Sequence, residues 1–210
     1  MKIPPEQQYK FFKIVLPDGI PAEGQRVLLH ACCAPCSAAI VECMLHNGMQ
    51  PTVFFSNSNI YPLQEYEIRK QEIIRFLAEQ QVPYVEDTYD HEEWRAEIHG
   101  LESEPERGSR CSVCFQYRLR RAALYAQEHG FPLLTTTLAS SRWKNIQQID
   151  CAGRIAVQDC PDVEWWEQNW RKGGLQTRRG ELLRLNQFYN QQYCGCEFSM
   201  SRLLREEQQA

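Results

Sequence analysis

Seven of the ten cysteines in this chain stand in three short groups, and sulfur at this spacing is typical of metal sites. A C-x2-C pair can place two sulfurs on one ion or one cluster, whereas vicinal and C-x-C sulfurs pack poorly as plain apolar side chains. We therefore predict that all seven bind metal. They are Cys32, Cys33, Cys36, Cys111, Cys114, Cys194 and Cys196.

Seven thiolates do not suit a single site. A structural zinc site closes with four ligands, and an iron–sulfur cluster also uses four cysteines. A cluster would leave three cysteines for a second metal with an open position, and we expect the sulfurs of the C-x2-C and C-x-C groups to be divided between the two sites. Cys32 or Cys36 would then belong to the second metal. A thioredoxin-like interpretation of Cys33 and Cys36 explains only two of the seven.

The other cysteines, Cys43, Cys151 and Cys160, are isolated in the sequence, and we expect them to be buried in the core. Structural disulfides are not expected, because Met1 to Gly19 contains no apolar signal segment and the cytoplasm keeps thiols reduced. The uncharged run from Val27 to Val41 is too short and too polar to span a membrane. We therefore expect a cytoplasmic protein without membrane association.

The net charge of -4 conceals an uneven distribution. Residues 61–109 hold 5 basic and 13 acidic residues, whereas residues 110–184 hold 12 basic and 7 acidic ones. A basic segment in an acidic protein fits a polyanionic substrate on one face. Solvated helices of differing composition explain the same distribution equally well.

The elements that must position the cysteines alternate between strand and helix patterns. This alternation predicts an α/β fold with a mainly parallel sheet flanked by helices. Strands are expected at residues 27–30, 52–55, 82–86 and 133–137. Helices are expected at 37–47, with Ser37 as the cap, at 63–80, 90–99 and 145–154, and from the second cysteine group to the vicinity of Gly130.

Three segments make up the predicted domain organisation. Residues 1–25 form an arm, residues 26–155 an α/β metal-binding catalytic domain, and residues 156–210 a mostly helical C-terminal appendage that completes the metal site. A helix is expected at 181–191. We expect Trp165, Trp166 and Trp170 to form the core of the appendage rather than a stacking platform.

The loop after the first strand lacks phosphate-binding glycines. Dinucleotide-binding enzymes place G-x-G-x-x-G there, and P-loop enzymes place G-x-x-x-x-G-K-[ST]. Cys32 to Ser37 occupies this position instead. Loops that follow the strands of an open α/β sheet gather at one edge, where ligands bind, so we expect metal rather than phosphate at this edge.

The cysteine groups belong to longer motifs that together resemble the epoxyqueuosine reductases of the QueH type. The motifs are His30-Ala31-Cys32-Cys33-Ala34-Pro35-Cys36-Ser37, Asn57-Ser58-Asn59-Ile60-Tyr61-Pro62 with Glu65-Tyr66 and Arg69, Cys111 to Cys114 with Phe115 and Arg118-Leu119, Thr135-Thr136-Thr137-Leu138 with Ser140 and Ser141, and Gln192-Tyr193-Cys194-Gly195-Cys196 with Ser199. They occur in this order over most of the chain, from about residue 26 to about residue 200.

This resemblance implies an oxidoreductase that performs the last step of tRNA queuosine biosynthesis. Epoxyqueuosine at the wobble position of tRNA would lose its epoxide oxygen through two electrons and two protons, without cobalamin. The resemblance also implies a 4Fe-4S cluster and an adjacent mononuclear iron held by cysteines, on a nucleotide-hydrolase-like sheet similar to that of other tRNA-modifying enzymes. Some members carry Asp where this chain has Cys36. The partners expected are the tRNA and an unidentified electron donor, and we expect a monomer.

Protons for such a reaction must come from groups near the metals. His30 lies two residues before the first thiol, and a histidine titrates in a suitable range. The hydroxyls of Tyr61 and Tyr193 are further candidate donors, with a packing role as the alternative for each. The alternative for His30 is a fixed hydrogen bond from the strand end to a neighbouring loop.

Polar residues that follow the strands are the candidate substrate contacts. They are Asn57, Asn59, Glu65, Arg69, Arg118, Ser140, Ser141 and Lys144. For Arg69 and Arg118, an ion pair or a place on a helix surface is an equal alternative. Contacts to the tRNA backbone are predicted for Arg171, Lys172, Arg178 and Arg179, with a solvated face as the alternative.

Two other functions remain open from the sequence. A zinc-dependent tRNA-binding module would be colourless and would contain zinc. A sulfur-inserting tRNA-modifying enzyme would bind ATP, and the missing pyrophosphate loop argues against it.

Overall fold

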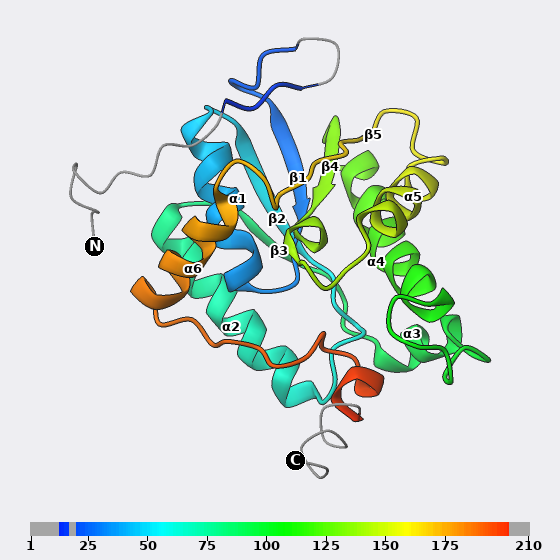
Figure 1. Cartoon of the computed structure of the whole chain (residues 1–210). Coiled ribbons are helices and arrows are strands. Elements are labelled where there is room, and N and C mark those ends of the chain that lie inside the picture. The colour runs from blue at the N-terminus through cyan, green and yellow to red at the C-terminus, as the bar shows by residue number, and fades with distance from the viewer. Residues whose placement is uncertain (1–12, 17–19, 202–210) are drawn as a thin grey trace.

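Five parallel strands form one sheet in the order β3-β2-β1-β4-β5 (Figure 1). The computed structural model describes residues 13–16 and 20–201. The strands are β1 Arg26–His30, β2 Gln50–Phe55, β3 Tyr84–Glu86, β4 Leu133–Thr136 and β5 Glu164–Trp165. The predicted α/β fold is confirmed, and the sheet is wholly parallel.

The buried strands carry apolar side chains on both faces, as a sheet covered by helices on both sides requires. In β1, Val27 and Leu29 belong to one core, whereas Leu28 belongs to the other. The neighbouring β2 continues this alternation, with Val53 in the first core and Phe54 in the second. Each strand therefore joins two layers of helices.

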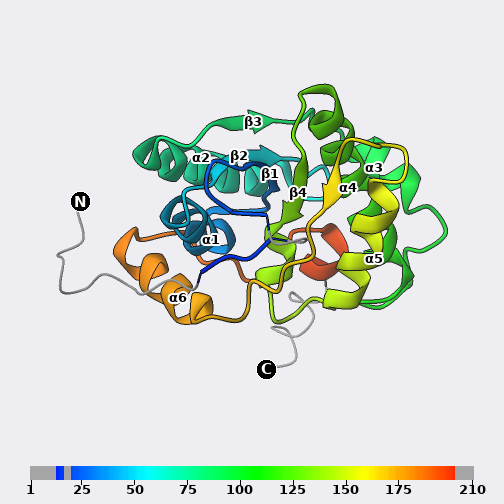
Figure 2. The same ribbon diagram turned by 90° about the horizontal axis from the view of Figure 1, so that it is seen from above.

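The helices divide between the two faces of the sheet (Figures 1 and 2). On the first face lie α1 Ala34–His46, α2 Leu63–Gln80 and α6 Leu175–Leu185; on the second lie α4 Ser109–Glu128 and α5 Ile146–Ala156, with α3 His91–Glu97 packed against α4. Two of these helices begin at side-chain caps, because Asp90 accepts from the backbone of Glu93 and Asn145 from that of Gln147.

Two predicted helix boundaries are wrong. The first helix begins at Ala34, with Pro35 in its first turn. Ser37 therefore lies inside the helix and does not cap it, and its hydroxyl donates a 2.7 Å hydrogen bond to the carbonyl of Cys33. The helix predicted at 181–191 instead spans Leu175–Leu185. The first change matters for the site, because it places Cys36 within the first turn of α1.

The segment after residue 155 contributes β5, which the sequence pattern did not predict. Trp165 of β5 pairs with Leu134 of β4 and packs against α5 at Gly153, where a Cβ atom would lie 2.0 Å from the indole. Trp165, Trp166 and Trp170 are all buried, and the last two pack edge to face. They do not form a separate core of the appendage as predicted, because Trp165 belongs to the core on the second face of the sheet and the other two to the core on the first.

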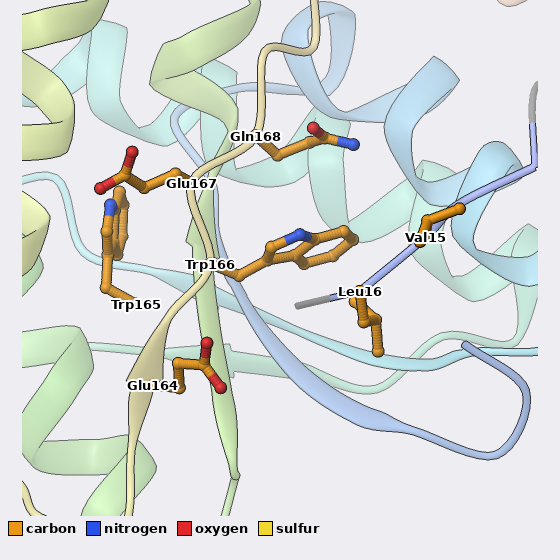
Figure 3. A pocket seen from close by; sticks show the side chains of 7 residues that line it. All are labelled: Val15, Leu16, Glu164, Trp165, Trp166, Glu167 and Gln168. Carbon is orange, nitrogen blue, oxygen red and sulfur yellow. The ribbon is translucent and has the colours of Figure 1, made fainter. Parts of the chain in front are cut away.

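A pocket lies between β5 and the segment before β1 (Figure 3). It is lined by Val15, Leu16, Glu164, Trp165, Trp166, Glu167 and Gln168. None of the predicted site residues lines it.

Cys43 and Cys160 are buried, as predicted, but Cys151 is exposed, so its predicted core position is wrong. Cys151 lies on the outer side of α5, whose buried face is formed by Ile149, Ala152, Gly153 and Ala156. Across residues 13–16 and 20–201, no helix combines the length and hydropathy needed to cross a bilayer.

Candidate metal centre at the carboxyl edge of the sheet

The first cysteine group lies at the switch point of the sheet. After β1 the chain enters α1 on one face, whereas after the adjacent β4 it passes through the short helix η3 Thr137–Ser140 to α5 on the other face. Ligands of open α/β sheets bind at such a point, beyond the carboxyl ends of the strands.

The sulfurs of Cys32, Cys33 and Cys36 form a compact set, which we call the trio. All three lie within 4.8 Å of one another, and the first two are 3.7 Å apart. Hydrogen bonds from Cys33 and Cys36 hold the pKa of Cys32 well below its usual range. Conversely, burial raises the pKa of Cys33, and the bond to Cys32 raises that of Cys36 to about 11. Cys32 is therefore the most acidic thiol of the trio.

Thr137, the first residue of η3, joins the trio to β4. Its hydroxyl accepts from the backbone N–H of Cys32 at 3.3 Å and lies 3.6 Å from the Cys32 sulfur. Sequence analysis gave Thr137 no role, although it stands within the Thr135-Thr136-Thr137-Leu138 motif.

The remaining four cysteines form a second set, which we call the tetrad. Cys111 and Cys114 lie in the first turns of α4, and Cys194 and Cys196 lie in the C-terminal segment. Burial, with a smaller contribution from the charges of other tetrad members, raises the pKa of Cys111 to about 11 and that of Cys196 to about 12. Cys114 and Cys196 belong to one buried cluster, so the two distant segments meet here.

The C-terminal segment returns along α2 to reach this edge, as the orange-to-red ribbon of Figure 1 shows. Arg69 of α2 fixes its end, because its guanidinium donates to the carbonyls of Tyr193 and Cys194 while its Nε donates to Glu65. Arg69 and Glu65, predicted as substrate contacts, thus form a buried ion pair that holds the tetrad in place.

Gly195 permits this approach. Its φ of 124° lies in the region that favours glycine, and its carbonyl accepts from the N–H of Tyr61 at 2.8 Å. A Cβ atom at this position would lie 3.0 Å from Arg69 Nη1 and 3.1 Å from Ile60. Steric contact with Arg69 and Ile60 therefore explains why a glycine stands between Cys194 and Cys196.

Arg118 and Asn57, also predicted as substrate contacts, connect the two cysteine sets. Arg118 of α4 donates to the carbonyl of Ser56 and to Asn57 Oδ1, and Asn57 Nδ2 donates 2.9 Å to the carbonyl of Ala31. All of these groups are buried. Their hydrogen-bonding capacity is used within the protein, which favours the internal alternative for Arg118.

His30 is not placed as a proton donor. It is fully buried, its Nε2 lies 3.1 Å from the carbonyl of Ser56, and its Nδ1 lies 2.7 Å from the hydroxyl of Thr136. Because a carbonyl only accepts, Nε2 carries the proton of a neutral ring. Burial and the charge of Arg118 lower the pKa of His30 to about 3. The geometry thus favours the fixed hydrogen bond over the donor role predicted first.

The second candidate proton donor, Tyr61, and the remaining candidate substrate residues differ in exposure. Tyr61 is 40% exposed and its ring stacks on His91. Asn59 is buried, and its Oδ1 has no hydrogen-bond partner in the described part of the chain. The hydroxyl of Ser140 donates to the carbonyl of Thr137, and that of Ser141 accepts from the N–H of Trp143.

Lys144 stands between the two cysteine sets. Its Nζ lies 3.4 Å from the sulfur of Cys194. Burial lowers the pKa of Lys144, but the charges of Cys194, Cys32 and Cys36 outweigh this effect and raise it overall. The ammonium group therefore faces sulfurs of both the trio and the tetrad.

The four predicted tRNA-backbone residues have separate environments. Arg178 is 3% exposed and pairs with Glu42 and Glu181, so its predicted phosphate contact conflicts with its burial. The pKa of Cys36 is raised, chiefly by its hydrogen bond to Cys32, and the charge of Arg179 partly opposes this rise. Arg171 donates to the carbonyl of Lys144, and Lys172 is exposed.

Arg110 is, after Thr137, a second positioning residue to which the sequence pattern assigned no role. Arg110 is buried, and its Nη1 donates to the carbonyls of Leu101, Glu102 and Glu104, which orders the loop before the Cys111–Cys114 pair. Arg110 is adjacent to Cys111 in the sequence, and this position was the only sequence feature that could have indicated its role.

Comparison with known proteins agrees with this geometry. The family model for epoxyqueuosine reductase QueH matches residues 27–202. Relatives with that name include proteins from Acinetobacter baylyi, 45% identical over 90% of this chain and 84% of its own length, and Haemophilus influenzae, 45% identical over 93% and 79%. The one from Thermotoga maritima is 32% identical over 88% of this chain and 94% of its own length. The matched region contains both cysteine sets, and the chain therefore belongs to the epoxyqueuosine reductase QueH family.

Proposed function

We propose that this protein removes the epoxide oxygen of epoxyqueuosine in tRNA and leaves the alkene of queuosine. Two carbon–oxygen bonds break, one carbon–carbon double bond forms, and two electrons and two protons convert the oxygen to water. The convergence of seven cysteines from three distant segments at one edge of the sheet is the observation that supports this proposal.

The trio suits a single metal ion. Two sulfurs bound to one ion at about 2.3 Å can be at most about 4.6 Å apart. The three sulfurs of Cys32, Cys33 and Cys36 already lie close to that limit. We assign this set to the mononuclear iron, and three protein ligands would leave a coordination position open for substrate.

The tetrad suits a 4Fe-4S cluster. A cluster takes four thiolates and spreads them over the corners of a cube, so its cysteines need not crowd as ligands of one ion do. Cys111, Cys114, Cys194 and Cys196 supply that number, and within the described residues they form no group as tight as the trio. In this assignment all cysteines of one motif bind the same metal group. The sequence had instead led us to expect that the cysteines of the C-x2-C and C-x-C motifs are divided between the two metal groups.

When bound, the two metal groups would supply the electrons and a Lewis acid. The protein supplies charge and position. Lys144 offsets negative charge between the sets, and Thr137 holds the loop that carries Cys32. Asn59 Oδ1 is a buried acceptor without a partner in the described chain, and it would pair with a donor on the modified nucleoside once the side chains that cover it move aside.

The experiment is conversion of tRNA that carries epoxyqueuosine by anaerobically purified protein with dithionite. The expected product is a nucleoside that has lost one oxygen atom, and Cys111→Ala should abolish its formation. Cys151→Ser is the matched control, because Cys151 is exposed and outside both sets. No conversion by the iron-loaded wild-type protein would refute the proposed reaction.

A further inference from the structure

Trp143 is a large apolar side chain without a packing surface of its own. It is 74% exposed, whereas the other four tryptophans are at most 7% exposed. An isolated apolar side chain at the surface needs no explanation, but an exposed indole beside a functional centre is a candidate contact.

The backbone on both sides of Trp143 is fixed. Arg107 Nε donates 2.7 Å to the carbonyl of Trp143, and Arg171 Nη2 donates 2.7 Å to the carbonyl of Lys144. The Lys144 ammonium in turn reaches Cys194. The loop is thus held in one place, with one side chain directed to the metal centre and its neighbour exposed to solvent.

Unneutralised cations surround this loop. Arg107 and Arg142 are exposed, Arg171 is half-buried, and none of the three forms an ion pair with a carboxylate of the described residues. Arg171 Nε is buried and has no hydrogen-bond partner there. Arg107 and Arg171 bind neighbouring carbonyls of the loop, and burial and the charge of Arg107 both lower the pKa of Arg171. Such an arrangement favours an anionic occupant.

We propose that Trp143 is a stacking platform for an unpaired base of the tRNA anticodon loop, next to the modified nucleoside, and that Arg107, Arg142 and Arg171 receive the adjacent phosphates. Unpaired bases stack on aromatic side chains, and cations follow the backbone between them. This surface rests on the proposed function, because it presents the wobble nucleoside to the cysteines. It also adds a residue that the motifs leave out.

Binding of tRNA carrying epoxyqueuosine tests the surface in the iron-loaded, full-length protein. Loss of one stacked base weakens binding by about tenfold, so Trp143→Ala should raise the Kd by that factor, and Trp143→Phe should restore most of the affinity. The control is Leu124→Ala, since Leu124 is 54% exposed on α4 and should leave the Kd unchanged. The iron content should equal that of the wild type in all three variants.

Acrylamide quenching gives a second readout that does not depend on activity. Trp143 is the accessible indole, so tRNA should protect the quenchable fluorescence of the wild type, and Trp143→Ala should lack that component. If Trp143→Ala bound tRNA as tightly as Leu124→Ala does, the proposed stacking role of Trp143 would be refuted, whereas the proposed reaction would be unaffected. Protection by a small acidic redox protein but not by tRNA would also overturn it. A wild-type protein that neither binds nor converts the tRNA would overturn the proposed function and this surface together.

Discussion

The ammonium nitrogen of Lys144 lies 3.4 Å from the sulfur of Cys194, although the two residues are 50 positions apart in the chain. Lys144 lies in the loop between η3 and α5, and Cys194 lies in the loop before the helical turn at 197–201. A positive charge at a cluster thiolate stabilises the more negative, reduced state and so raises the reduction potential.

Replacing Lys144 tests this electrostatic role. Lys144→Gln should lower the reduction potential of the proposed cluster by about 60 mV, which corresponds to a tenfold change in the equilibrium constant for one electron. Lys144→Arg keeps the positive charge and should leave the potential close to that of the wild type. Potentiometric titration followed by electron paramagnetic resonance measures both. Equal potentials in Lys144→Gln and wild type would show that the lysine does not act on the cluster.

Gly195 should tolerate no side chain. Gly195→Ala would combine an unfavourable positive φ with a contact against Arg69, so we expect a loss of about 1–3 kcal/mol in unfolding free energy and a lower iron content. Gly180 in α6 is the matched control, because a Cβ atom there meets nothing within 4 Å. Gly180→Ala should leave iron content unchanged and slightly raise stability, as measured by urea unfolding. Normal iron in Gly195→Ala would remove the steric argument.

His30 should make the metal-free protein sensitive to acid. Its pKa is about 3 when folded and near 6.5 in the unfolded chain, so below pH 6.5 the unfolded state binds a proton that the folded state does not. Its contribution to stability is complete above pH 6.5 and falls by at most about 1.4 kcal/mol per pH unit as the pH drops toward 3.

The comparison for His30 is His30→Gln, which keeps a polar side chain but does not titrate. Urea unfolding at a series of pH values should give a shallower slope for the variant between pH 6.5 and 4. Identical slopes in the two proteins would show that His30 is protonated in the folded state and would reopen its role as a proton donor.

Arg178 and Lys172 should separate stability from tRNA binding. Arg178 is buried in a bidentate pair with Glu42, so Arg178→Gln should cost about 3–5 kcal/mol by leaving a carboxylate unpaired. Lys172 is exposed, and Lys172→Gln should reduce the salt dependence of tRNA binding by about one charge without affecting stability. A changed salt slope in a folded Arg178→Gln protein would contradict this division.

Local signals in the sequence were enough for most of the sheet and for the cysteines. The helix predicted at 63–80 matches α2, because its apolar residues repeat along one face. In contrast, β5 has two residues, too few for any alternation to be visible, and its placement depends on contacts with distant segments: Trp165 pairs with Leu134 of β4 and packs on Gly153 of α5.

The roles of polar residues were harder to predict, because they depend on contacts between distant segments. A buried Arg69 that holds a loop and an exposed arginine that binds phosphate look the same in sequence, and the partner carbonyl of Cys194 is 125 residues away. His30 illustrates the same limit, since its neutral state follows from burial and from Ser56 and Thr136. Grouping of the cysteines into a trio and a tetrad likewise needed three-dimensional placement.

The metal content of two cysteine variants tests the central claim most directly. With a cluster in the tetrad and one iron in the trio, anaerobic wild-type protein should contain about five irons and about four sulfides. Cys36→Ala should keep the four sulfides and lose about one iron, whereas Cys111→Ala should lose the sulfide together with most of the iron. Equal loss of sulfide from both variants, or wild-type protein that holds only zinc, would contradict the division into a mononuclear and a cluster site.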